Sequence, residues 1–260
     1  VLNVAGKVDL SEVQDNAQNL IGNVQHQETE REITDKSITL IENQDDTLPL
    51  NPDEIENVHI IMPDYGEGDK AKALKAALNE QGLTQVTGVL ISETTEDAEK
   101  TNIDGAQTII VGTAATEPSP VEDNGDSFST SLKRLSSASN SLVFNVHERQ
   151  KAEEIDDNQF AYSMMKYAFD NQKRVIHLTL RAPYDVVNFE DVSHSAIATY
   201  NYYGIDEQGN DLGSHVMESV AKTILGTLNP NGRLPVQVFE QNEDGNMGDL
   251  KYPIGHGLSY

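Results

Sequence analysis

Apolar residues along this chain alternate between short runs of strand length and longer stripes with helical spacing. The runs predict β-strands near residues 58–62, 85–91, 107–111, 142–146, 175–180 and 195–199. The stripes predict helices near residues 69–80, 94–102, 127–139, 158–171 and 213–226. A repeated rhythm of strand and helix is typical of a mostly parallel sheet with helices on both faces. We therefore predict an α/β fold, a three-layer α/β/α sandwich around a mostly parallel sheet of about six strands.

Two further helical stripes precede the first of these strands. They cover Ser11 to Gln25 and Glu28 to Asn43, and the proline-containing segment from Leu48 to Pro52 then extends the chain toward the strand at 58–62. We expect residues 1–50 to be leading helices and a linker that pack on the domain. Residues 51–260 are expected to form the α/β domain itself.

The densest group of polar side chains follows the apolar run at 175–180. Pro183 moves the preceding residue out of helical space, so the strand should end in a loop. Ligands of open α/β sheets bind at the carboxyl ends of the strands, so this loop is a candidate rim for a binding site. Its candidate residues are Arg181, Tyr184, Asp185 and Asn188. A second interpretation is that Arg181 and Asp185 form an ion pair that only braces the loop.

One long segment, residues 113–126, is too polar and proline-rich for a core and longer than an ordinary connection. Its acidic residues are Glu117, Glu122, Asp123 and Asp126. One of them could supply a carboxylate for acid–base chemistry. A single acidic loop does not hold an acid and a nucleophile at a fixed separation, however, and such loops are more often simply solvated.

Other kinds of site have weaker support in the sequence. Gly66 to Ala71 fits the dinucleotide-binding pattern G-x-G-x-x-A, but acidic residues crowd the amides that would hold a pyrophosphate, so a glycine-rich turn before a helix is the simpler interpretation. The seven histidines show no metal-binding spacing, and His177 within a strand is better explained as a hydrogen-bonded core residue. The chain has no cysteine and no G-x-S-x-G motif. We therefore predict no metal and no cofactor.

The charge of the chain limits its partners. Lys and Arg number 18 against 43 Asp and Glu, a formal net charge of −25. Such a charge repels phosphate backbones and anionic lipids, so we expect no nucleic-acid partner, and no apolar run is long enough for a membrane span. The acidic residues are spread along the chain, which suggests a salt-adapted or extracellular protein. The first residue is not Met, so we expect a piece of a longer protein.

Three stretches together resemble the C-terminal domain of family 3 glycoside hydrolases. They are KSITLIEN at 36–43 with Leu48-Pro49-Leu50, NPNGRLP at 229–235, and YPIGHGLSY at 252–260. The order and spacing of the stretches agree with the family. RAPYDVVNF at 181–189 and the following Ala198-Thr199-Tyr200 look most like the β-N-acetylglucosaminidase branch of Gram-positive bacteria. The resemblance covers roughly residues 28–260.

The resemblance implies that catalysis requires a second domain. In this family an N-terminal (β/α)8 barrel carries the aspartate nucleophile, and in the N-acetylglucosaminidase branch an Asp-His pair on a barrel loop is the acid/base. Other branches take a glutamate from the sandwich, in a pattern resembling G-E-x-P-Y followed by E-x-x-G-D. Here Thr113 follows Gly112 in place of that glutamate, although EDNGD at 122–126 fits the second half. This departure leaves Glu122 as a secondary acid/base candidate.

The implied protein is a retaining glycosidase that hydrolyses terminal β-linked N-acetylglucosamine. Its partners would be the barrel of the same protein and an N-acetylglucosamine-containing oligosaccharide, and it would work outside the cell or at a bacterial cell wall. The chain alone is predicted to be inactive and to shape the rim of the sugar site through Arg181, Tyr184, Asp185, Asn188 and Asp126. The alternatives are a stand-alone carbohydrate or peptidoglycan binding module and a nucleotide-binding α/β protein.

Overall fold

The computed structural model describes residues 23–55, 57–64, 68–114, 157–210, 212, 215–241 and 247–260. Three predicted elements lie wholly or largely outside these residues. They are the helix at 127–139, the strand at 142–146 and the helix at 11–25.

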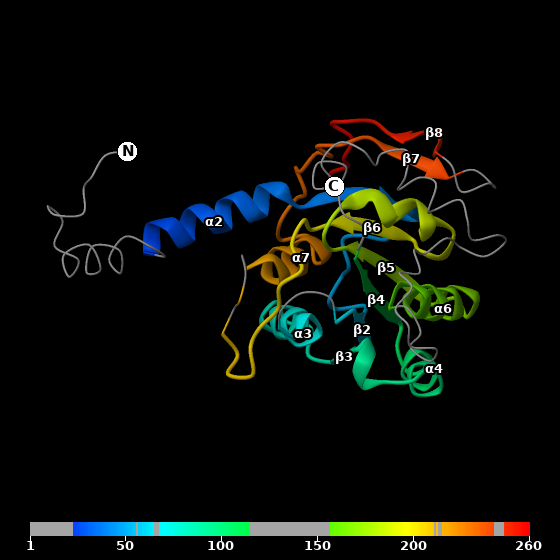
Figure 1. Ribbon diagram of the computed structural model, residues 1–260. Helices are drawn as coiled ribbons and strands as arrows, with labels where there is room; N and C mark the ends of the chain where they lie inside the picture. The colour runs from blue at the N-terminus through cyan, green and yellow to red at the C-terminus, as the bar shows by residue number, and fades with distance from the viewer. Residues whose placement is uncertain are drawn as a thin grey trace, which may run out of the picture.

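A six-stranded sheet forms the centre of the molecule (Figure 1). Its strands are β1 (Thr39–Asn43), β2 (Val58–Met62), β3 (Val86–Leu90), β4 (Thr108–Thr113), β5 (Arg174–Thr179) and β6 (Ser195–Ala198). Their order across the sheet is β1-β6-β5-β4-β2-β3. The neighbouring strands β6, β5, β4, β2 and β3 pair in parallel, and β1 pairs antiparallel with β6. The mostly parallel α/β sandwich predicted from the sequence is confirmed.

The edge strand β1 corrects one prediction. A helix was expected from Glu28 to Asn43, but α2 (Val24–Ser37) ends at Ser37, and Thr39 to Asn43 pair with β6. The apolar run ITLI has strand length, and three successive residues of it are buried in the sheet. A short apolar run fits either secondary structure, so the available strand partner decides between them. The sheet therefore includes a strand that lies ahead of residue 51, where the domain was predicted to begin.

Helices cover both faces of the sheet (Figure 1). Helices α3 (Lys70–Glu80) and α7 (Val216–Ile224) pack against each other on one face, above the core cluster that contains Ile60, Ile110 and Ile176. Helices α4 (Glu96–Asp104) and α6 (Asp157–Asp170) lie on the other face, above Ile61, Val111 and Val175. Successive residues of a strand point to opposite faces, which is why each strand contributes to both clusters.

The end of the chain closes the β1 edge of the sandwich. The hairpin of β7 (Val238–Gln241) and β8 (Met247–Tyr252) packs over Ile41 and Ala196. Gly232 must be a glycine, because a Cβ there would collide with the carbonyl oxygens of Ser37 and Ile38. Short 3-10 helices lie in the connections: η1 (Gln44–Asp46), η2 (Ile91–Glu93), η3 (Pro183–Asn188) and η4 (Glu190–Val192).

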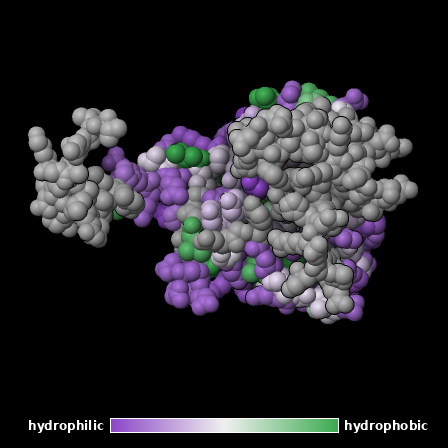
Figure 2. All heavy atoms as spheres, in the orientation of Figure 1, coloured by the Kyte–Doolittle hydropathy of each residue, from purple (hydrophilic) through white to green (hydrophobic). Residues whose placement is uncertain are grey.

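The visible surface of the described residues is predominantly hydrophilic, most clearly along α2 (Figure 2). This helix projects from the body of the molecule (Figure 1), and only Thr34 among its residues is buried. Because α2 is polar and buries only one residue, tertiary packing stabilises it less than it stabilises the other described helices.

Candidate functional site

The carboxyl edge of the sheet brings together the ends of β4 and β5. Thr113 ends β4 and lies opposite Thr179, the last residue of β5. The chain leaves β5 through Leu180, Arg181 and Ala182 and enters η3 at Pro183. The loop predicted as a candidate rim thus lies at the edge where ligands of such sheets bind.

Asp185 does not present its carboxylate to solvent. The residue is 6% exposed. Its Oδ2 atom accepts from the Thr113 hydroxyl at 2.6 Å, and its Oδ1 atom lies 2.5 Å from the Thr179 hydroxyl. Burial raises the pKa of Asp185 to about 6, against the opposing effect of these hydrogen bonds. The residue therefore joins β4, β5 and η3 from inside the loop.

His177 extends this network beneath the sheet edge. Its Nε2 atom lies 2.7 Å from the Thr113 hydroxyl, and its ring stacks against Phe189 with the centroids 4.7 Å apart. Complete burial lowers the pKa of His177 to about 3, so the ring is neutral. The prediction of a hydrogen-bonded core histidine is confirmed. Thr113 belongs to the segment 113–126 that the sequence analysis considered, whereas Thr179 was not among the predicted site residues, although it ends a β-strand at the ligand-binding edge.

The other predicted rim residues lie nearer the surface. Tyr184 is 41% exposed, while Arg181 and Asn188 are half-buried. No ion pair joins Arg181 to Asp185, because the carboxylate faces the two threonine hydroxyls instead. The ion-pair alternative from the sequence is therefore wrong. In η3 the side chains of Asp185 and Val186 point inward and Tyr184 points outward, so a contiguous loop divides into an anchoring part and an exposed part.

Glu122 and Asp126 lie outside the described residues. Glu122 as an acid/base and Asp126 as a rim residue both stay predictions.

The described part of the Gly66–Ala71 motif, from Gly68 onward, contains the N-cap of α3. Asp69 Oδ1 accepts from the Lys72 amide at 2.7 Å, and Gly68 packs so closely on Gly204 and Ile205 that a Cβ would lie 2.9 Å from the Ile205 carbonyl oxygen. Lys70 is fully buried, and its Nζ donates to the Gly68 carbonyl at 3.1 Å. An acidic side chain thus occupies the amide end of α3 that a pyrophosphate would need, which argues against the nucleotide-binding alternative.

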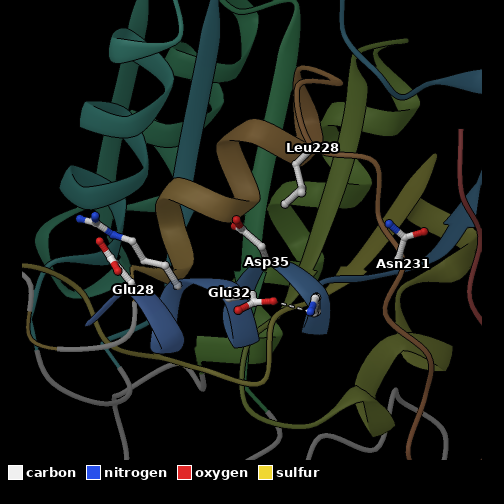
Figure 3. A pocket seen from close by; sticks show the side chains of 7 residues that line it. Glu28, Glu32, Asp35, Leu228 and Asn231 are labelled. Atoms are coloured by element: carbon white, nitrogen blue, oxygen red, sulfur yellow. Dashed lines mark hydrogen bonds and ion pairs between the residues drawn. The ribbon is translucent and has the colours of Figure 1, made fainter. Parts of the chain in front are cut away.

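A hollow of about 440 Å³ lies between α2 and the segment that follows α7 (Figure 3). Glu28, Glu32 and Asp35 line it from α2, and Leu228 and Asn231 line it from the opposite side. The junction of α2 and β1 is at the carboxyl end of β6, because Thr39 lies opposite Ala198 in an antiparallel pair. No local sequence pattern indicates this hollow, since its two sides are far apart along the chain.

Within the described ranges no three potential metal-ligating side chains of His, Cys, Asp or Glu cluster together. No described helix is long and apolar enough to cross a membrane.

The sandwich, its topology and its sequence motifs define the class of protein. The profile of the glycosyl hydrolase family 3 C-terminal domain matches residues 38–260. The chain belongs to this family, and the resemblance identified in the sequence is confirmed.

Individual relatives agree with this assignment. Beta-hexosaminidase A of Pseudoalteromonas piscicida is 29% identical over 85% of this chain and 34% of its own length. A lysosomal beta glucosidase of Dictyostelium discoideum is 24% identical over 92% of this chain and 28% of its own. The chain thus spans about a third of these relatives.

Solved structures share the fold. The β-glucosidase of Listeria innocua, a D270A variant in complex with laminaribiose, superposes with a TM-score of 0.61 at 15% identity, over 95% of this chain and 35% of that one. A fungal multi-domain GH3 beta-N-acetylglucosaminidase gives a TM-score of 0.56 at 19% identity, over 90% of this chain and 21% of that one.

Proposed function

We propose that this chain is the C-terminal sandwich of a retaining β-N-acetylglucosaminidase and that it supports a sugar site whose catalytic residues lie in an upstream barrel. The observation that carries the proposal is the environment of Thr113. This residue stands where other branches of the family resemble G-E-x-P-Y, and it is buried, with its hydroxyl bonded to Asp185 and facing His177. A glutamate contributed from this position is therefore absent, which favours the branch whose acid/base lies in the barrel.

Similarity to relatives also supports this substrate class. A hexosaminidase is 29% identical to this chain and a β-glucosidase is 24% identical. Since both activities occur among the relatives, the choice of sugar needs a direct test.

The sandwich would act by positioning. Tyr184 is exposed on the η3 loop and Arg181 directly precedes this loop, while Asp185 anchors it from inside. An anchored loop holds a rim side chain at a defined place, and such placement lowers the entropic cost of binding a sugar. In an extended protein, Arg181→Ala would therefore raise KM more than it lowers kcat, and Tyr184→Ala would do so more weakly.

The test compares hydrolysis of a chromogenic β-N-acetylglucosaminide by this chain alone and by the chain extended upstream through its reading frame. Activity only in the extended protein is expected. A chromogenic β-glucoside in the same assay tests the sugar. Preference for the glucoside would contradict the proposed substrate, and activity of the chain alone would contradict the proposed division of labour and direct attention to Glu122.

The alternative of a carbohydrate or peptidoglycan binding module has a separate test. Retention of N-acetylglucosamine oligomers by the isolated chain, with no gain in activity on upstream extension, would favour it. The acidic composition further supports a location outside the cell or at a bacterial wall, which we include in the proposal.

A further inference from the structure

The Asp185 network contains more hydrogen-bond contacts than its hydroxyl groups have hydrogens. Thr179 Oγ1 lies 2.7 Å from the Ala182 carbonyl oxygen and 2.5 Å from Asp185 Oδ1. A hydroxyl has one hydrogen, and a carbonyl oxygen only accepts. If Thr179 donates to Ala182, its contact with Asp185 is a hydrogen bond only when Asp185 itself supplies a proton.

The other half of the network agrees with this proton count. The buried Nδ1 atom of His177 has no hydrogen-bond partner, so the ring hydrogen belongs on Nε2, which faces the Thr113 hydroxyl. Thr113 then donates to Asp185 Oδ2. The hydrogen bonds run in one direction, from His177 through Thr113, Asp185 and Thr179 to the carbonyl of Ala182. Each donor has one acceptor, and bonds aligned in this way strengthen one another.

Among the described residues, the carboxyl group of Asp185 has hydrogen-bond donors but no cationic partner. The titratable groups on the neighbouring elements are Arg174 and His177 in β5, Arg181 ahead of η3, Tyr184 in η3, Glu190 and Asp191 in η4, and Glu240, Asp249, Lys251 and Tyr252 in the hairpin. None of them forms an ion pair with Asp185 in the described part of the chain, and Lys251 instead pairs with Glu190 and Glu240. Burial is the largest effect on the carboxyl group and raises its pKa to about 6.

We propose that Asp185 is a protonation switch that sets the conformation of the turn carrying Arg181. With the proton present, Asp185 donates to Thr179, and Thr179 holds the carbonyl of Ala182. When the proton leaves to solvent, the hydroxyls of both threonines donate to the carboxylate, and the Ala182 carbonyl loses the Thr179 hydroxyl as a donor. Ala182 directly follows Arg181, so the proton on a buried group controls a cationic side chain at the ligand-binding edge. This inference goes beyond the proposed function and does not depend on the sugar.

The first test follows the wild-type chain by 13C-detected NMR between pH 3 and pH 8. The Asp185 carboxyl carbon, assigned through its backbone, should titrate with a midpoint well above the ordinary aspartate value, and the Ala182 carbonyl carbon should move with the same midpoint. A midpoint at or below the ordinary value would overturn the proposal. So would an Ala182 signal that does not follow the titration.

The second test uses Asp185→Asn, whose amide can accept from Thr113 and donate to Thr179 as the protonated acid does. A carboxyl group with a raised folded pKa stabilises the fold at low pH and loses that contribution as pH rises through the folded pKa. The unfolding constant of the wild type relative to the variant should therefore rise on the order of 50-fold between pH 4 and pH 7. Asp170→Asn, at an exposed carboxylate in α6, is the matched control and should show no such rise. A ratio that falls with pH would overturn the switch.

Discussion

Two buried carboxylates lie on the same side of the sheet and meet opposite electrostatic environments. Glu99 of α4 is fully buried and accepts from His59 Nε2 at 2.6 Å, from the Thr94 hydroxyl at 2.7 Å and from the Asn102 amide at 2.9 Å. Among the described side chains, Asp185 of η3 has the hydroxyls of Thr113 and Thr179 as its hydrogen-bond partners. The first carboxylate faces an imidazole that can carry charge, and the second faces neutral groups alone.

The difference between their pKa shifts follows from these partners. Burial raises the pKa of Glu99, but the hydrogen bonds and the charge of His59 outweigh it, so the net pKa is below the ordinary value. Burial dominates at Asp185 and the net pKa is raised. Burial alone therefore does not determine whether a carboxylate is ionised, because the number and charge of its donors decide the sign. The Glu99 network stabilises the fold at neutral pH, whereas the Asp185 network does so at acidic pH.

The largest expected effect comes from removing the charged network. Glu99→Ala should lower the free energy of unfolding by about 3 kcal/mol at pH 7, since it leaves the buried His59 ring without its acceptor. Urea denaturation measures the change. Glu96→Ala in the same helix, whose partner Lys100 is 36% exposed, is the control and should cost less than about 1 kcal/mol. If both variants lose the same free energy of unfolding, burial of the Glu99 network does not increase its contribution to stability.

A smaller loss is expected when the neutral network is broken. Thr113→Val keeps the shape of the side chain but removes the donor to Asp185 and the acceptor for His177, at a cost of about 2 kcal/mol. Thr113→Ser should restore most of that stability. Thr101→Val, at an exposed hydroxyl of α4, should be nearly neutral in the same denaturation experiment. If Thr113→Val is as stable as the wild type, the hydroxyl is not part of a working network.

The pH dependence of Glu99 should be opposite in sign to that of Asp185. Because the folded pKa of Glu99 is lowered, its contribution is present above its ordinary pKa of 4.5 and is lost as pH falls through the folded value. The stability advantage of the wild type over Glu99→Gln should therefore be complete at pH 7 and shrink below pH 4.5. Denaturation curves between pH 3 and pH 7 measure it. An advantage that grows toward low pH would refute the contrast.

The smallest expected effect is that of salt on the stability differences between the wild type and the variants of the two networks. Molar NaCl should raise the Tm of the wild type, because it screens the repulsion expected from a net charge of −25. The buried networks are shielded from ions, so the differences in Tm among the wild type, Glu99→Gln and Asp185→Asn should stay the same. Thermal melts in low and molar NaCl test both statements. A wild-type Tm that does not rise would reject the salt-adaptation hypothesis.

The sequence determined the sandwich because each parallel strand is an apolar run and each crossover helix is an amphipathic stripe. These signals are local, as in Val58 to Met62, where all five residues are buried. The motifs at 36–43, 229–235 and 252–260 also identified the family, which the profile match confirms. Local patterns failed at Thr39 to Asn43, where the strand state depends on pairing with β6, more than 150 residues away.

Only the tertiary structure decided what the candidate site residues do. The sequence does not distinguish the roles of Arg181, Asp185 and Asn188, because all three are polar residues of one predicted loop. The fold buries the Asp185 carboxylate against Thr113, which is 72 residues away, and leaves Arg181 near the surface. Hydrogen bonds of this kind form between side chains that the folded chain brings together, and the protonation of a carboxyl group depends on those partners. The sequence therefore determined which chemical groups the edge contains, and packing decided which of them are buried and which lie near the surface.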